Sequence, residues 1–143
     1  MSYITETIVP AKFLSLISQV VMTITIVFTR KDHIYTALGN DASESSSEFE
    51  DAEASLLACV TLALIFNAFE VGVLFSGVSL FHDKVNISEI FLHCVGVILL
   101  SWFILDDWTY EAIWAIWAFT SLVPFLLEIL VVATSKRIYK VKT

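Results

Sequence analysis

Three ionisable side chains of this chain lie inside long apolar stretches, where a charged group needs a partner or a water-filled cavity. They are Glu70, His93 and Glu128, and the uncharged polar residues Gln19 and Asn67 accompany them. In a membrane, such side chains face protein or water rather than lipid. Counted along helices that rise about 1.5 Å per residue, Glu70 and Gln19 share one depth, and His93 and Glu128 form a pair at another.

Two kinds of chemistry are open to these groups. Glu70 and Glu128 could serve a small ion- or proton-coupled transporter or channel subunit, because acids inside a membrane can relay protons. Alternatively, a protonated Glu70 bonds a neighbouring helix, an interaction of about 0.6–2 kcal/mol in membranes. A single acid near the midplane, without a sequence repeat or a pair of broken helices, favours the interhelical hydrogen bond.

The sequence lacks the residue patterns of an enzyme. His82 beside Asp83 fits a polar turn, and His33 has no metal-ligand partner at a useful spacing. The chain also lacks a glycine-rich phosphate loop and a serine or cysteine nucleophile with an adjacent base. We therefore expect no enzymatic activity, no catalytic residue, no cofactor and no metal site.

Four apolar runs must position the polar groups, at residues 11–29, 55–81, 88–105 and 111–135. Each is close to the 20 or so residues that cross a hydrocarbon core of about 30 Å. The mean hydropathy is +0.81. Helices of a soluble bundle would show a polar face, whereas residues 62–80 and 90–105 are apolar nearly all round. The sequence therefore predicts an all-α integral membrane protein, a single domain that forms a four-transmembrane-helix bundle in contact with membrane lipids.

The segments outside the runs differ in charge. Residues 30–54 are acidic and rich in serine, a composition that predicts a flexible outer loop whose last residues can extend the second helix. Residues 136–143 form a basic tail. The formal net charge of −7 gives no support to nucleic-acid binding.

Lysine and arginine residues near the span ends predict the orientation. Arg30 and Lys31 lie on one side, whereas Lys12, Lys84 and the four basic residues of the tail lie on the side of both termini. This asymmetry predicts that the N- and C-termini are cytoplasmic.

Small residues mark helix faces that could pack closely. In the second run, Ala68, Gly72 and Ser76 recur every four residues, while Glu70 and Gly77 point to roughly the opposite side. One face could pack inside the bundle while the other contacts a partner protein or a second copy of the chain, or both faces could be internal. In the fourth run, Pro124 predicts a kink, and Ser121 can help to satisfy the carbonyl that the proline leaves free.

A motif in the second run is more specific than its hydropathy. The run Ser76-Gly77-Val78-Ser79-x-Phe81 begins six residues after Glu70. Further positions at matching spacings are Val9-Pro10, Phe13-Leu14, Leu16, Ile24-Thr25, Arg30, Val60-Thr61-Leu62, His93-Cys94, Ser101, Phe103-Ile104, Trp108, Trp114, Pro124 and Glu128. In these residues the chain resembles the transmembrane protein 107 family of the ciliary transition zone. The resemblance covers the four spans and departs from the family pattern at residues 31–54.

The resemblance implies a non-enzymatic component of the Meckel-syndrome module at the base of the cilium. Members of the family help to anchor or recruit tectonic, B9-domain and meckelin-like proteins, which form a gate that controls the composition of the ciliary membrane and supports cilium assembly. The rival hypotheses are the transporter or channel subunit and a four-span scaffold of another membrane.

Overall fold

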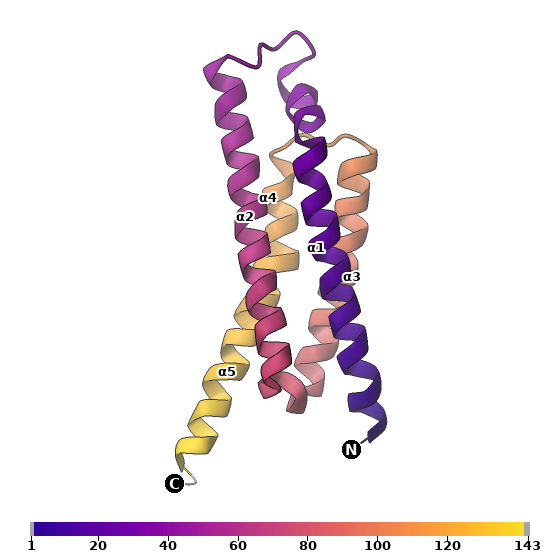
Figure 1. Cartoon of the computed structure of the whole chain (residues 1–143), viewed down its shortest axis with the longest axis vertical. Coiled ribbons are helices and arrows are strands. Elements are labelled where there is room, and N and C mark those ends of the chain that lie inside the picture. The colour runs from indigo at the N-terminus through magenta and orange to yellow at the C-terminus, as the bar shows by residue number, and fades with distance from the viewer. Residues whose placement is uncertain (1, 142–143) are drawn as a thin grey trace.

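Helices make up almost all of the chain in the computed structural model, which describes residues 2–141, with side chains described for residues 6–79 and 82–135. The helices are α1 (Ser2–Leu38), α2 (Ser47–Ser76), α3 (Asp83–Leu105), α4 (Ala112–Trp117) and α5 (Val123–Val141). A 3₁₀ turn, Val78–Phe81, precedes α3, and a π-helical turn, Ala118–Leu122, joins α4 to α5. Figure 1 shows both termini at one end and the α1–α2 connection at the other.

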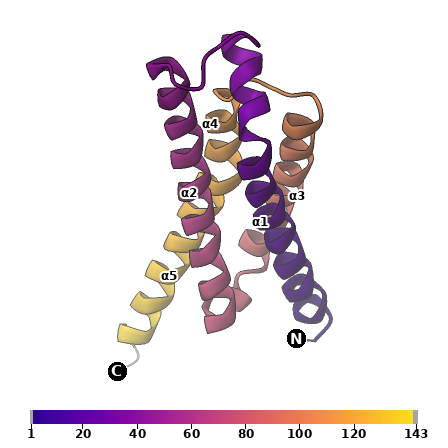
Figure 2. The same ribbon diagram turned by 45° about the horizontal axis from the view of Figure 1, so that its top comes forward.

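Four helical segments are long and apolar enough to cross a membrane: Glu6–Leu38, Ser47–Ser76, Asp83–Leu105 and Ala112–Ser135. The last is composite, because it runs through α4, the π-helical turn and α5. This confirms the predicted all-α four-span architecture. Seen from a second angle, α5 diverges from the N-terminal half of α1 (Figure 2).

The outer loop is much shorter than expected. The acidic loop was predicted over residues 30–54, but α1 continues to Leu38 and α2 begins at Ser47. The 37 residues of α1 correspond to about 55 Å of helix, so α1 must project beyond a hydrocarbon core of about 30 Å. The acidic composition is therefore compatible with helix here, because a small core lies beneath it: Ile34, Phe49 and Ala52.

Specific caps and ion pairs hold this projecting hairpin. The Ser46 side chain accepts a hydrogen bond from the backbone N–H of Phe49 at the start of α2. Arg30 pairs with Glu53 across the two helices, with 2.5 Å between Nε and Oε1. Lys31 and Tyr35 both donate to Glu44, and these hydrogen bonds lower the pKa of the Glu44 carboxyl.

The second span ends earlier than predicted. Residues 55–81 were expected to form one span, but α2 stops at Ser76, and Gly77 adopts a left-handed conformation with φ of 74°. Glycine takes this conformation without the steric penalty that a Cβ would bring. Gly77 is therefore a helix-terminating residue, which corrects its expected role on a helix-packing or partner-contact face.

The interior divides into two halves along the bundle axis. The half nearer the α1–α2 connection is mostly apolar, although the buried His33 lies there against Phe103. Its apolar core draws on all four spans: Ile26, Leu56, Cys59, Val60, Leu100, Phe103, Ile113 and Ile116. At its outer edge, Trp114 Nε1 donates to Ser55 Oγ at 3.0 Å. The half nearer the termini is polar and contains the groups described below.

The orientation of this bundle in the membrane is testable. In a chain without native cysteines, Ser43→Cys in the α1–α2 connection should react with an impermeant maleimide added outside intact cells, because the basic residues favour cytoplasmic termini. A cysteine at Thr143 should react only after permeabilisation. Labelling of Thr143→Cys in intact cells would reverse the orientation.

Candidate functional site

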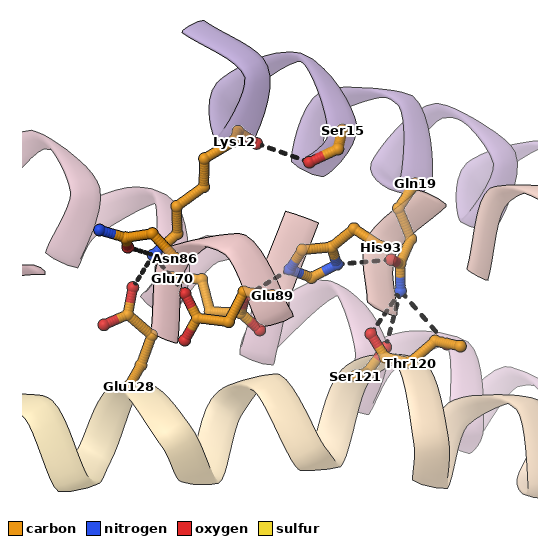
Figure 3. A network of polar contacts seen from close by, with 10 residues as sticks. All are labelled: Lys12, Ser15, Gln19, Glu70, Asn86, Glu89, His93, Thr120, Ser121 and Glu128. Carbon is orange, nitrogen blue, oxygen red and sulfur yellow. Dashed lines mark hydrogen bonds and ion pairs between the residues drawn. The ribbon is translucent and has the colours of Figure 1, made fainter. Parts of the chain in front are cut away.

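A network of buried polar side chains links all four spans in the half of the bundle nearer the termini (Figure 3). Its members have at most 7% of their surface exposed. They are Lys12, Ser15 and Gln19 from α1, Glu70 from α2, Asn86, Glu89 and His93 from α3, Thr120 and Ser121 from the π-helical turn, and Glu128 from α5. The sequence predicted Gln19, Glu70, His93 and Glu128 as intramembrane polar groups, and the structure brings all four into this network.

Gln19 connects α1 with two other spans. Its Nε2 donates to the backbone carbonyl of Thr120 at 3.0 Å and to Ser121 Oγ at 3.1 Å. Its Oε1 lies 2.6 Å from Nδ1 of His93. The helices approach closely here because Gly96 has no side chain: a Cβ at this position would lie 2.9 Å from both Gln19 Oε1 and Thr120 Cβ.

The proline of the fourth span explains why Gln19 can donate to a helix backbone. Pro124 has no N–H, so it cannot bond the Thr120 carbonyl four residues earlier. The π-helical turn lies directly before it, as is common where the helical ladder is interrupted. Ser121 was expected to help satisfy the freed carbonyl. In the structure, Gln19 donates the hydrogen bond to the Thr120 carbonyl.

His93 joins Glu70 to Gln19, because its Nε2 lies 2.7 Å from Glu70 Oε2. Glu70 and Gln19 therefore share a depth, as expected, and His93 bridges them. The expected pairing of His93 with Glu128 is wrong. Depths counted from span ends did not include the different starting heights of α3 and α5, or the bend at the π-helical turn.

Glu128 instead contacts Lys12, which also lies 2.5 Å from Glu89 Oε2 and donates to Asn86 Oδ1 at 3.0 Å. Sequence reasoning treated Lys12 as a flanking cytoplasmic charge and overlooked Glu89. Helical spacing was the available signal, since Lys12 precedes Gln19 by seven residues and Glu89 precedes His93 by four. Without Lys12, five basic residues on the terminal side still exceed the two on the other.

The remaining predicted residues lie on two faces of α2. Asn67 is fully buried, and neither atom of its amide has a hydrogen-bond partner. Ala68, Gly72 and Ser76 lie on an exposed face, and no heavy atom is within 4 Å of a Cβ built at Gly72. The structure therefore resolves the alternative that the sequence left open: the face with Glu70 is internal and the small-residue face is external.

The side chains of the network contact one another across the helices. Among the described residues, no group of three or more histidine, cysteine, aspartate or glutamate side chains could hold a metal ion. A cavity of about 10 Å³ beside Gln19 and Thr120 has room for about one water molecule. The carboxyl, imidazole and ammonium groups contact one another and the helix backbone, rather than facing a space of substrate size.

Gly96 should be sensitive to small changes that Gly72 tolerates. Gly96→Ala places a methyl group against Gln19 and Thr120, and overpacking of this kind destabilises by about 1–3 kcal/mol. Gly72→Ala, which enters open space, is the matched control and should unfold like the original protein. Detergent-based unfolding measures both, and equal stability of the two variants would contradict the close packing of α1, α3 and the π-helical turn.

Lys12 should matter far more than a surface lysine. Lys12→Met leaves a buried carboxylate without its cation, a loss of about 3–5 kcal/mol. Lys31→Met is the control, because Lys31 and Glu44 are about half exposed and water compensates for their separation. The same unfolding assay compares them, and a Lys12→Met protein as stable as Lys31→Met would show that Lys12 is not buried among carboxylates.

Comparison with known proteins identifies the family. The family model of the TMEM107 transmembrane protein matches residues 8–132. Transmembrane protein 107 of Rattus norvegicus is 32% identical over 121 residues, 85% of each chain. The Homo sapiens protein is 29% identical over 127 residues, 89% of each chain, and the Danio rerio protein is 28% identical over 131 residues, 92% of this chain and 96% of its own. No solved structure matches the chain. The chain therefore belongs to the transmembrane protein 107 family of integral membrane proteins.

Proposed function

We propose that this protein is a non-enzymatic membrane component of the ciliary transition zone, where it anchors or recruits other transition-zone proteins. Tectonic, B9-domain and meckelin-like proteins are the partners that the family resemblance implies. The proposal rests on membership of the transmembrane protein 107 family and on one structural observation. That observation is the exposed small-residue face of α2, formed by Ala68, Gly72 and Ser76.

This face has the properties of a helix-docking surface within the membrane. The hydrophobic effect does not drive two apolar helices together in a bilayer, because lipid tails are equally apolar. Association therefore depends on close backbone approach and interhelical hydrogen bonds. Gly72 leaves the backbone of α2 open to such an approach. Phe75 is 75% exposed and Ile65 is 57% exposed, so bulky side chains next to this face are available to a partner helix.

The buried network explains why recruitment would use apolar and small surfaces. Glu70 bonds His93, Glu128 bonds Lys12, and Gln19 bonds both α3 and the π-helical turn. These polar groups form hydrogen bonds with one another inside the bundle and do not face a partner helix outside it. A partner helix in the bilayer would therefore contact the outer faces of the spans, of which the α2 face permits the closest approach.

A small ion- or proton-coupled transporter or channel subunit is the second candidate, because Glu70 and Glu128 are ionisable and fully buried. Each carboxyl already has a basic partner, and neither carboxyl lines the cavity of single-water size beside Gln19. Proteoliposome flux separates the two functions. Ion or proton flux that Glu70→Gln abolishes would support transport and contradict the scaffold.

The scaffold predicts a specific localisation defect. Gly72→Leu should insert in the membrane and remain folded, yet leak from the ciliary base together with at least one partner protein, because leucine keeps a neighbouring helix at a distance. Fluorescence microscopy of tagged protein in ciliated cells, with co-purification of partners, measures both effects.

Ala133→Leu is the matched control, because it adds similar bulk to an exposed position of α5. It should localise like the original protein. If Gly72→Leu localises normally while substitutions at Asp41 and Glu44 mislocalise the protein, recruitment depends on the α1–α2 connection and the α2 face has no part in it.

A further inference from the structure

The polar network has an unbalanced formal charge. Lys12, Glu70, Glu89, His93 and Glu128 are all fully buried. In their ordinary ionisation states near neutral pH, three glutamates and one lysine give a net charge of −2, with histidine neutral. A net charge inside a membrane bundle is strongly unfavourable, so the hydrogen-bond geometry should reveal protons that this count omits.

One proton can be located from the acceptors around Gln19. The backbone carbonyl of Thr120 can only accept a hydrogen bond, so the Gln19 nitrogen must face it. The Gln19 oxygen then faces His93 Nδ1, which must carry a hydrogen. The remaining ring nitrogen, Nε2, lies 2.7 Å from Glu70 Oε2. A hydrogen bond between these atoms requires one proton, whether it belongs to Glu70 or to the imidazole.

A second proton follows from the surroundings of Lys12. Its ammonium contacts both Glu89 and Glu128. Among the described side chains, Lys12 is the one cation that forms an ion pair with these two carboxyls. One positive charge offsets one carboxylate, and two carboxylates that share a site do not both ionise readily. The Lys12 ammonium lies within hydrogen-bond distance of one oxygen of each carboxyl, and the other oxygen of each carboxyl has no hydrogen-bond partner. The geometry therefore assigns the second proton to the Glu89–Glu128 pair.

We propose that the polar network is a two-proton site, with one proton held in the Glu70–His93 hydrogen bond and one on the Glu89–Glu128 pair beside Lys12. These protons make the network electrically neutral. The other polar groups that face it do not titrate: Ser15, Gln19, Asn86, Thr120 and Ser121. Figure 3 shows the residues that hold these protons, His93 with Glu70 and Lys12 with Glu89 and Glu128.

This assignment fixes the direction of the pH dependence. Between about pH 7 and 8, below the midpoint for ionisation of a free cysteine thiol, a free glutamate is ionised, a free imidazole is neutral and a free lysine is protonated. The folded protein then binds two more protons than the unfolded chain, so its stability must fall as the pH rises. The unfolding equilibrium constant should increase by up to about 100-fold per pH unit, a factor of about ten for each proton.

The experiment measures unfolding of the full chain in mixed detergent micelles from about pH 7 to pH 8, a range in which the thiol of Cys59 remains mostly protonated in the unfolded chain as well. Glu70→Gln keeps a donor for His93 Nε2 but holds no titrating proton, so the pH dependence should fall to about tenfold per unit. Glu89→Gln leaves the neutral Lys12–Glu128 pair and should have the same effect. The double variant should be nearly independent of pH, and Glu48→Gln, at an exposed position, should behave like the original chain.

A pH dependence that neither Glu70→Gln nor Glu89→Gln reduces would overturn the proposal. The proposal would also be overturned if the unfolding equilibrium constant of the original chain changed only about tenfold per pH unit and added sodium stabilised the protein. That result would mean that a metal cation occupies the place of the second proton. Nitrogen NMR of His93 in the unsubstituted protein provides a test that does not depend on variants. One protonated nitrogen and one in a strong hydrogen bond to a carboxyl group supports the first proton, whereas a hydrogen-free Nδ1 contradicts it.

Discussion

A polar group in hydrocarbon has no water to bond, so a partner on another span or on its own helix stabilises each buried donor or acceptor that finds one. Gln19 links three helices at once in this way, because it bonds His93 of α3 and the Thr120 carbonyl of the fourth span. The positions of α1, α3 and the π-helical turn depend on one another through this amide. Lys12 extends the same arrangement towards the termini, where it joins α3 to α5.

The backbone is adapted to these contacts. Pro124 leaves a carbonyl without its helical donor, and the π-helical turn presents that carbonyl to Gln19. Gly96 permits the approach, because a methyl group there would meet both partners. The polar half of the bundle thus combines an interrupted helix, a missing side chain and a long amide. The other half is closed by apolar packing around Leu56 and Phe103.

This division separates the interior of the bundle from the surface that a partner would contact. The charged groups contact one another inside, so the proposed lateral contacts would use exposed apolar and small residues, among them Gly72, where no heavy atom lies within 4 Å of a built Cβ. The same pairing gives the interior a state of protonation that depends on the folded arrangement, since Glu70 requires a proton only because His93 and Gln19 are oriented around it. The proposed assembly with partners and the proposed two-proton site therefore use different parts of one small bundle.

The sequence by itself determined the four spans, because the free energy of transfer into lipid depends on the length and hydropathy of a local segment. It also identified Gln19, Glu70, His93 and Glu128 as groups that cannot face lipid. Only the tertiary structure decided their partners, since pairing depends on the relative height, rotation and bend of separate helices. It likewise showed that residues 30–38 and 47–54 are helical. Ile34 and Phe49 pack in one small buried core between these two helical segments, and the acidic composition of the segments does not predict that core. Lys12 shows the same limit: its charge predicts a position in water, but three oxygen-bearing side chains from α3 and α5 stabilise it inside the bundle.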